Sequence, residues 1–439
     1  MYIELPENVK KIIETLENAG FEAYAVGGCI RDSLLGRTPN DWDITTSAQP
    51  LETKALFRNT FDTGIQHGTV SVLLDREIYE VTTYRIDGEY EDSRHPKEVT
   101  FTSNLKEDLL RRDFTINAMA YNNRTGLVDL YNGVEDLKSG IIRCVGNPYD
   151  RFSEDALRIM RAIRFAAQLD YSIDEETKKA MSLLAPNLSK ISAERIQTEL
   201  VKLLISDHPD YIRDAYELGI TKVILPEFDV MMETSQNNPH HMYSVGEHSI
   251  HVLMGVTNEK AVRLAALLHD CGKPAAKETD VRGVDHFHNH PAIGAVMAQN
   301  ILKRLKFDND TISKVYKIVL HHDWTMSAEV KDIRKHVYNI GEECFPDMFS
   351  FNRADVKAQS EYKQKEKLSF LDKLEAAYNE FRAKGECISL KDLKVKGKDL
   401  IEAGIEPGPE IGKQLKNLLD MVLEDPSKND RDFLLSQIK

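Results

Sequence analysis

The feature that most constrains the fold is a change in hydrophobic pattern near residue 150. Before it, short apolar runs alternate with turns and occasional helical segments, as in a mixed α/β unit. After it, residues 153–169, 174–184 and 193–205 carry apolar side chains at helical spacing, with almost no strand signal. Because 439 residues exceed what one small core uses, about three structural units are expected. The pattern predicts an α/β N-terminal part followed by an all-α remainder.

The N-terminal part predicts a strand, a glycine turn and a helix in succession. Residues 6–20 have helical spacing, residues 21–26 form an apolar run, and residues 30–35 begin a second helix. Gly27 and Gly28 fill the turn before this helix. Because glycine has no Cβ, the backbone can approach a ligand closely, and the first N–H groups of the helix can face an anion. The pattern is typical of a phosphate site, although paired glycines also occur in ordinary turns.

Two carboxylates follow this turn. Asp41 and Asp43 lie in a segment, residues 41–46, that alternates like a strand, so both are expected on one face of it. Carboxylates held this close repel each other, and Mg²⁺ relieves the repulsion when phosphates and water complete its oxygen ligands. Glu80 lies on the second strand of a hairpin predicted around residues 75–77. It is either the third carboxylate of a two-metal catalytic site or a plain edge-strand glutamate.

The first long helix of the all-α part carries a charged ridge. Ser153 is its expected N-cap. Four charged side chains recur at steps of three: Asp155, Arg158, Arg161 and Arg164. On a helix they form a slanted ridge, which is either a ladder of internal salt bridges or a surface that reads a nucleotide. Guanidinium groups bind phosphates and base edges, and a carboxylate accepts from an exocyclic amine. Arg112 is a further candidate for contacting a triphosphate or ribose.

Five blocks occur in a fixed order along the first half of the chain. They are Gly27-Gly28-x-x-Arg31-Asp32-x-Leu34-Leu35-Gly36-Arg37 with Asp41-x-Asp43, residues 80–85, residues 111–120, Glu154-Asp155-x-x-Arg158, and Ala193-Glu194-Arg195-Ile196. Together they resemble the class II tRNA nucleotidyltransferases, the family of CCA-adding enzymes and bacterial poly(A) polymerases. Five ordered blocks are far more specific than any single motif.

The resemblance implies a role for each matching residue. Asp41 and Asp43 would bind the catalytic Mg²⁺, while Gly28 and Arg31 would hold the triphosphate of the incoming nucleotide. The rest of the implied nucleotide pocket is Arg112, Arg161 and Arg164, with Asp155 and Arg158 pairing with the base edges of CTP and ATP. Residues 86–96 fall where the family keeps a flexible loop for switching from C to A addition. A loop of normal size argues against an enzyme that adds only cytidines.

Histidines and acids gather in helical segments after a polar stretch at residues 233–243. The candidate metal ligands are His248, His269, Asp270, His290, His322 and Asp355. Such a set suits a divalent transition metal. Residues 264–273, with His269-Asp270 in their centre, resemble the hallmark of HD-domain metal-dependent phosphohydrolases. The neighbouring His321 leaves the register at His322 open by one residue. An HD domain that is only structural is the alternative.

These resemblances imply an α/β nucleotidyltransferase head followed by an all-α neck, body and tail that contain a helical HD domain. The expected boundaries are 1–140 for the catalytic head, 141–232 for the neck and body, which select the nucleotide and bind RNA, 233–360 for the HD domain, and 361–439 for a tRNA-binding helical tail. The Gly/Pro-containing residues 404–412 should interrupt the helices of the tail.

Composition sets limits on partners and location. The net charge of −14 argues against a nucleic-acid partner unless a basic groove is local. The five cysteines show no zinc or redox spacing, which favours a reducing cytoplasm. Neither an apolar segment of about 20 residues nor a signal peptide is evident, so neither membrane insertion nor secretion is expected. The oligomeric state is left open.

The resemblances therefore imply a template-independent enzyme that builds or repairs the 3′-terminal CCA of tRNA from CTP and ATP, and the HD domain suggests an additional phosphohydrolase activity. Enzymes that add only the terminal A, and poly(A) polymerases, share these blocks and remain alternatives. An alternative of another class is an HD-type phosphohydrolase acting on RNA ends or nucleotides. A non-catalytic RNA-binding scaffold is disfavoured because it does not explain two sets of metal-type ligands.

Overall fold

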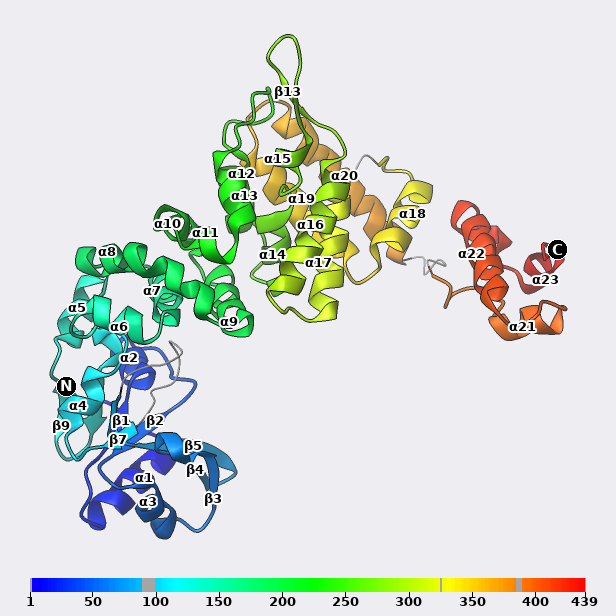
Figure 1. The fold of residues 1–439 in the computed structure, drawn as a ribbon. Helices are drawn as coiled ribbons and strands as arrows, with labels where there is room; N and C mark the ends of the chain where they lie inside the picture. The colour runs from blue at the N-terminus through cyan, green and yellow to red at the C-terminus, as the bar shows by residue number, and fades with distance from the viewer. Residues whose placement is uncertain (1, 89–98, 324–325, 384–388, 439) are drawn as a thin grey trace. The chain divides into compact units, whose positions relative to one another are not determined.

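The computed structural model describes residues 2–88, 99–323, 326–383 and 389–438. The chain divides into two compact units, Met1–Pro226 and Glu227–Lys439 (Figure 1). The first unit contains the main sheet and the second is almost entirely helical. This bears out the predicted succession of an α/β part and an all-α part.

The first unit is built on a seven-stranded sheet with the order β3-β4-β5-β2-β1-β8-β9. The strands are β1 (Ala23–Val26), β2 (Asp43–Thr46), β3 (Thr60–Gly64), β4 (Thr69–Leu74), β5 (Glu77–Thr83), β8 (Met119–Asn122) and β9 (Gly126–Asp129). Within the described strands of this sheet, β2 and β5 pair in parallel and the other neighbours pair antiparallel. Ile44 lies beside Val81 in the parallel register. Since Asp43 and Glu80 precede these two residues, the register brings both acids to the same end of the paired strands.

Helices and short ribbons complete this unit. They are α1 (Glu7–Asn18), α2 (Gly28–Leu34), α3 (Pro50–Leu56), α4 (Leu105–Leu110) and α5 (Gly133–Ser139), with β6 (Arg85–Asp87) paired to β7 (Val99–Phe101). The predicted hairpin joins β4 to β5 through Asp75 and Arg76, whose φ angles of 50° and 71° match a two-residue type I′ turn. Residues 89–98, most of the predicted 86–96 loop, lie outside the described residues.

The helical part of the first unit contains one correction to the sequence analysis. Its helices are α6 (Pro148–Glu154), α7 (Leu157–Leu169), α8 (Glu175–Leu184), α9 (Ala193–Leu204), α10 (Ile212–Glu217) and α11 (Thr221–Ile224). The single helix predicted from Ser153 is wrong, because Asp155 is extended (φ −140°, ψ 102°) and separates α6 from α7. Ser153 lies in the last turn of α6, and Asn147 caps the start of that helix by accepting from the amide of Tyr149.

The second unit packs its helices around a buried centre. They include α12 (Pro226–Glu233), α13 (Val245–Gly255), α14 (Lys260–Leu268), α15 (Lys273–Ala276), α16 (His290–Arg304), α17 (Asn309–His321), α18 (Val330–Ile340), α19 (Phe345–Ala358) and α20 (Gln364–Ala383). Helix α13 packs against α14 and α19, and α17 packs against α14 and α16 (Figure 1). A hairpin of β12 (Lys277–Thr279) and β13 (Asp285–Phe287) lies between α15 and α16 in the sequence.

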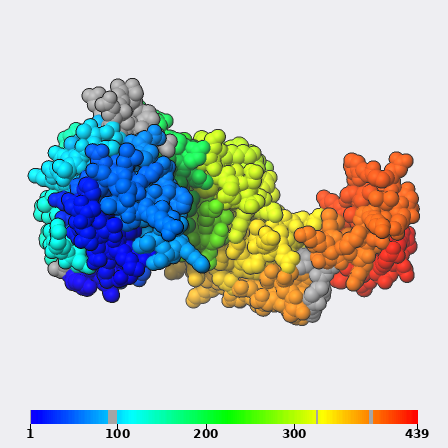
Figure 2. All heavy atoms as spheres, turned by 90° about the horizontal axis from the view of Figure 1, so that it is seen from below, coloured from blue at the N-terminus to red at the C-terminus, as the bar shows by residue number. Residues whose placement is uncertain are grey.

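The last described segment, from residue 389, has a hydrophobic core of its own. Its helices are α21 (Gly397–Glu402), α22 (Pro409–Glu424) and α23 (Arg431–Ser436), and residues such as Leu400, Leu419 and Val422 are fully buried between them. The atoms of this segment, orange to red, form a compact mass in the space-filling view (Figure 2). The predicted interruption at residues 404–412 separates α21 from α22. In the described ranges, no helix combines the length and the apolar character that crossing a bilayer requires.

Candidate functional site

A strand, a glycine turn and a helix form one wall of the first site. Gly27, between β1 and α2, has a φ of 86°, which disfavours any residue with a side chain. A Cβ at this position would also lie 3.2 Å from Nη1 of Arg112. The turn therefore needs glycine for its backbone angle and for the close approach of a guanidinium group.

A cavity of about 620 Å³ opens beside this turn and is called the basic cavity below. Its lining includes Gly28, Asp41 and Asp43. Seven arginines line it as well: Arg31, Arg111, Arg112, Arg158, Arg161, Arg164 and Arg195. So strong a local excess of positive charge suits a triphosphate, whatever the acidic total of the chain.

The two predicted metal-binding aspartates reach the basic cavity from different backbone environments. Strand β2 begins at Asp43, so the expectation that Asp41 also lies on the strand is wrong; Asp41 precedes the strand. The pairing ends there because Asp43 faces Val26, the last residue of β1. Burial of the Asp43 carboxylate raises its pKa, Arg112 opposes this rise, and the charge of Asp41 adds to it. The two carboxylates therefore interact across the cavity wall.

Glu80 lies close enough to both aspartates to interact with their charges. The pKa of Glu80 is raised by burial first and then by the charges of Asp43 and Asp41. With both aspartates it lines a second cavity of about 860 Å³, which also contains Trp42 and Ile78 and is called the outer cavity below. Three carboxylates, two of which raise the pKa of the third, form a donor set suited to a hard divalent cation.

Arg31 and Arg112 are both fixed by neighbouring groups. Nη1 of Arg31 donates to Oδ1 of Asn117 at 2.8 Å, and its Nε donates to Asp32 at 2.9 Å. Nη2 of Arg112 lies 3.4 Å from the fully buried Asp108. Burial alone would raise the pKa of Asp108, but the charges of Arg111 and Arg112 hold it below its ordinary value.

Asp155 and Arg158 line the basic cavity, but they do not form part of one helical ridge. Oδ1 of Asp155 accepts from the amide of Leu157 at 3.0 Å, and Oδ2 accepts from Nη2 of Arg195 at 2.6 Å. Nη1 of Arg158 donates to Glu154 at 2.7 Å. The carboxylate that breaks the predicted helix is thus held by a residue of α9.

Arg161 and Arg164 are paired with acids of the protein. Nη2 of Arg161 lies 2.5 Å from Oδ2 of Asp113, and although burial raises the pKa of Asp113, the charge of Arg161 helps to lower it to about 2. Nε of Arg164 lies 2.7 Å from Glu199, and both side chains are buried. Burial lowers the pKa of Arg164 to about 10, so the group stays charged at neutral pH.

Several cavity-lining residues were not among the predicted site residues, and four of them are Arg111, Asp113, Asn117 and Arg195. All four lie inside blocks that the sequence analysis quoted, residues 111–120 and the Ala193–Ile196 run. Block membership was therefore the signal that could have identified them. The structure brings all predicted nucleotide-site residues to the basic cavity and leaves Glu80 in the outer cavity.

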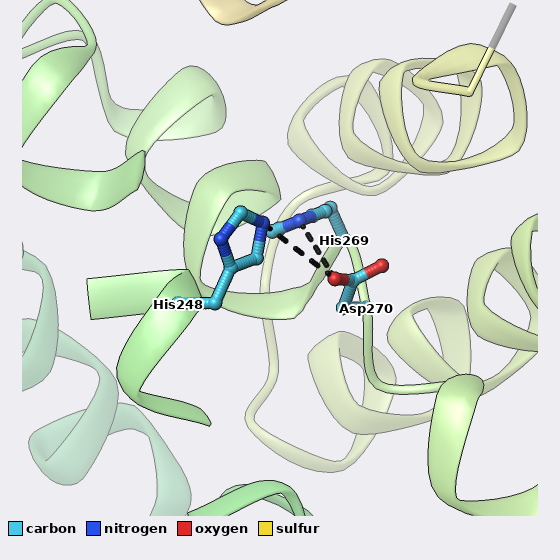
Figure 3. Close-up of side chains that lie close together, drawn as sticks. All are labelled: His248, His269 and Asp270. Carbon is cyan, nitrogen blue, oxygen red and sulfur yellow. Dashed lines mark ion pairs between the residues drawn. The ribbon is translucent and has the colours of Figure 1, made fainter. Parts of the chain in front are cut away.

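The predicted histidine site converges inside the second unit. Figure 3 shows His248 from α13 facing His269 and Asp270, which follow α14. Oδ2 of Asp270 lies 3.1 Å from Nε2 of His269 and 3.8 Å from Nε2 of His248. The other oxygen, Oδ1, lies 3.4 Å from Nε2 of His290 and 3.5 Å from Nε2 of His322. The structure thus places His322, rather than His321, in the cluster.

The sixth predicted ligand closes this set from α19. Oδ1 of Asp355 lies 2.9 Å from Nε2 of His248 and 3.9 Å from Nε2 of His269. All six side chains approach through imidazole Nε2 or carboxylate oxygen atoms, which are metal-binding atoms.

The backbone orients three of these rings. Nδ1 of His269, His290 and His322 lies 2.9, 2.8 and 2.7 Å from a backbone carbonyl oxygen. A carbonyl can only accept, so each Nδ1 carries a proton and the neutral ring presents an unprotonated Nε2 to the cluster. The Nε2 atoms of His290 and His322 are only 3.2 Å apart, a contact that two lone pairs favour only with a cation nearby.

Buried polar atoms in this cluster lack ordinary partners. Nε2 of His269 and both oxygens of Asp270 have no hydrogen-bond partner among the described residues. Nζ of Lys273 lies 2.7 Å from Asp270 and forms an ion pair with it. Burial would raise the pKa of Asp270, but His269 and Lys273 hold it well below its ordinary value. An ionised carboxylate surrounded by imidazole nitrogens fits a divalent transition metal.

Comparisons with known proteins find relatives of the chain along almost its whole length. Three family profiles match the chain: "Poly A polymerase head domain" at residues 23–143, "Probable RNA and SrmB- binding site of polymerase A" at 170–232, and "tRNA nucleotidyltransferase domain 2 putative" at 291–438. The CCA-adding enzyme of Limosilactobacillus reuteri is 35% identical over 99% of this chain and 96% of its own length. That of Levilactobacillus brevis is 35% identical over 98% of this chain and 97% of its own length.

A solved structure gives the same result for the fold. The crystal structure of the Bacillus stearothermophilus CCA-adding enzyme in complex with CTP has a TM-score of 0.71 and 28% identity to this chain. The alignment covers 98% of this chain and 95% of that one.

Proposed function

The chain belongs to the family of CCA-adding enzymes, and on this premise we propose that it builds or repairs the 3′-terminal CCA of tRNA from CTP and ATP, releasing pyrophosphate. The observation that carries the proposal is the basic cavity, in which Asp41 and Asp43 face seven arginines. The related CCA-adding enzyme of Bacillus stearothermophilus was crystallised in complex with CTP.

The proposed site combines a cation site with a triphosphate site. Asp41 and Asp43 would hold Mg²⁺, which when bound lowers the pKa of an attacking hydroxyl and neutralises charge at phosphorus. Glu80 is the third carboxylate in reach of this site, as its raised pKa reflects. The arginines of the basic cavity, Arg31 and Arg112 among them, neutralise the triphosphate and orient it.

The reaction is an in-line displacement at the α-phosphorus. The 3′-oxygen of the tRNA forms a bond to this phosphorus, the bond from the phosphorus to the bridging oxygen breaks, and pyrophosphate leaves with the electron pair. The proton of the 3′-hydroxyl passes to solvent. Positioning and charge neutralisation by Arg31, Arg112, Arg161 and Arg164 supply most of the rate.

Base selection is assigned to Asp155 and Arg158. A carboxylate has about four acceptor positions, and the Leu157 amide and Arg195 occupy two of those on Asp155. The exocyclic amine of cytosine or adenine would bind a remaining position. Pairing with Arg195 holds the Asp155 carboxylate in place, so the base is read by groups that are already oriented.

The test offers the purified protein tRNAs that lack none, one, two or three of the terminal nucleotides, with each nucleoside triphosphate supplied separately. We expect CTP to extend tRNA lacking all three nucleotides or the last two, and ATP to extend tRNA ending in CC. Refusal of CTP by tRNA that lacks all three would identify an enzyme adding only A. Extension of non-tRNA ends by many adenylates would identify a poly(A) polymerase.

A second activity, metal-dependent phosphohydrolysis, is favoured by the histidine cluster in the second unit. The supporting observation is the set of buried atoms on His269 and Asp270 that have no hydrogen-bond partner among the described residues. The cluster opens into a cavity of about 640 Å³, large enough for a nucleotide-sized phosphoester. The metal content of the purified protein and its release of p-nitrophenol from p-nitrophenyl phosphate test this. A purely structural HD domain predicts neither metal nor hydrolysis.

We retain the domain boundaries 1–140, 141–232, 233–360 and 361–439 and the cytoplasm as further parts of this proposal. Among described residues the cysteines are free and buried: Cys29, Cys144, Cys271 and Cys344. This condition suits a reducing compartment.

A further inference from the structure

The two cavities of the first unit share a wall of acids but differ in chemistry. Asn40, Asp41 and Asp43 line both. The basic cavity holds seven arginines, whereas the residues that line the outer cavity include neither lysine nor arginine. Besides the carboxylates of Asp41, Asp43, Glu77 and Glu80, the outer cavity presents apolar and aromatic groups: Pro6, Pro39, Trp42, Ile78 and Tyr79. One side of the acids thus suits a polyphosphate, and the other suits the flat, uncharged surface of a base and its ribose.

The outer cavity also explains an exposed apolar side chain. Ile78, on β5, has 63% of its surface exposed, and its strand alternates so that Ile78 and Glu80 lie on the same face. Trp42 lies between the two aspartates in the sequence and is half-buried. The exposed parts of Trp42 and Ile78 do not pack in the core. Both side chains line the same cavity as the catalytic carboxylates, next to the position that a reacting group would occupy.

Reaction geometry decides what the outer cavity holds. In an in-line displacement the attacking oxygen stands opposite the leaving group. If the pyrophosphate leaves on the arginine side, the attacking hydroxyl must approach from the other side of Asp41 and Asp43. We propose that the outer cavity is the acceptor subsite, in which the 3′-terminal nucleotide of the tRNA stacks on Trp42 and contacts Ile78. This inference rests on the proposed nucleotide addition and assigns the binding position of its second substrate.

The kinetic test compares Trp42→Ala and Trp42→Phe with the unchanged protein, using an acceptor-stem RNA hairpin that ends in CC and ATP as substrates. Loss of one base–aromatic stack lowers affinity roughly tenfold to a hundredfold. We expect Trp42→Ala to lower kcat/KM for the hairpin by about that factor, to leave KM for ATP within about twofold, and to be largely rescued by Trp42→Phe. Ile78→Ala should lower kcat/KM for the hairpin by less. Leu51→Ala, another exposed aliphatic residue at 72% exposure, should change nothing.

A binding signal distinguishes stacking from a structural role. The sequence contains two tryptophans, so Trp324→Phe leaves Trp42 as the only one. In this variant, the hairpin ending in CC should quench the tryptophan fluorescence, whereas a blunt hairpin without single-stranded 3′ nucleotides should not.

Three outcomes would overturn the inference: a Trp42→Ala defect confined to KM for ATP, unchanged kcat/KM for the hairpin, or equal fluorescence with both hairpins. Failure of the unchanged protein to add any nucleotide would instead reject the proposed function, so the two failures are distinguishable.

Discussion

The arginines of the basic cavity are held by carboxylates of the same chain. Arg161 pairs with Asp113, Arg164 with Glu199 and Arg195 with Asp155. A guanidinium fork fixed on one side by a carboxylate loses little freedom when its other donors bind a phosphate. The sequence analysis left two interpretations of these charged residues, internal salt bridges or a surface that reads a nucleotide. Both apply, because internal ion pairs orient the same arginines that we propose to bind the nucleotide.

The first prediction concerns Asp113 and pH. Its folded-state pKa of about 2 lies below the ordinary 3.8, so its ionised form stabilises the folded chain above pH 3.8. This contribution, about 2 kcal/mol, is lost as the pH falls through 3.8 towards 2. Urea titrations of the unchanged protein and Asp113→Asn should give free energies of unfolding that differ at pH 6 and converge as the pH falls towards 2. A difference that is constant with pH would contradict this assignment.

The sequence spacing identified Asp41 and Asp43 as candidate metal ligands, but it wrongly placed Asp41 on the strand that begins at Asp43. Alternation cannot show where a strand begins, because that depends on its partner; here β1 ends opposite Asp43. The same limit applied to His321 and His322. The sequence did not show which of these adjacent histidines is the metal ligand. The hydrogen bond from Nδ1 of His322 to the Val319 carbonyl orients the His322 ring towards the cluster.

Between elements, the ion pair of Arg164 and Glu199 joins α7 to α9 in the interior. The second prediction is that Glu199→Gln destabilises the first unit by about 3–5 kcal/mol, because it leaves a buried guanidinium without its counter-charge. Glu194→Gln, at an exposed position of the same helix, is the matched control and should cost less than about 1 kcal/mol. Urea unfolding followed by circular dichroism measures both. Equal midpoints for the two variants would show that the pair contributes little.

Helical periodicity predicted α1, α2, α8 and α9 and the helical character of the second unit, yet it missed the break at Asp155. The apolar spacing continues across α6 and α7, so the pattern gives no sign of an interruption. The break depends on the Asp155 carboxylate, which binds the Leu157 amide and Arg195 on α9. Arg195 is 40 positions away from Asp155 in the sequence, so this contact depends on the tertiary structure and cannot be predicted from the local spacing of apolar residues.

Across the whole molecule, the two candidate sites lie in different compact units and use different donor sets. The third prediction is a double dissociation. His269→Ala should remove any bound transition metal and any p-nitrophenyl phosphate hydrolysis while CCA addition stays within about twofold, and Asp41→Asn should do the reverse. Metal analysis and the two activity assays on each variant check this. If His269→Ala also abolished nucleotide addition, the sites would not be independent.

The most direct measurement of the central claim is incorporation of labelled CTP into tRNA lacking its CCA end, by the unchanged protein, Asp43→Asn and Asp75→Asn. Asp75 lies in the exposed β4–β5 turn, where asparagine tolerates the positive φ, so it is a matched control. Loss of several kcal/mol of charge stabilisation predicts a rate lower by roughly 10²–10³-fold for Asp43→Asn and near-normal addition for Asp75→Asn. Normal addition by Asp43→Asn would contradict the account.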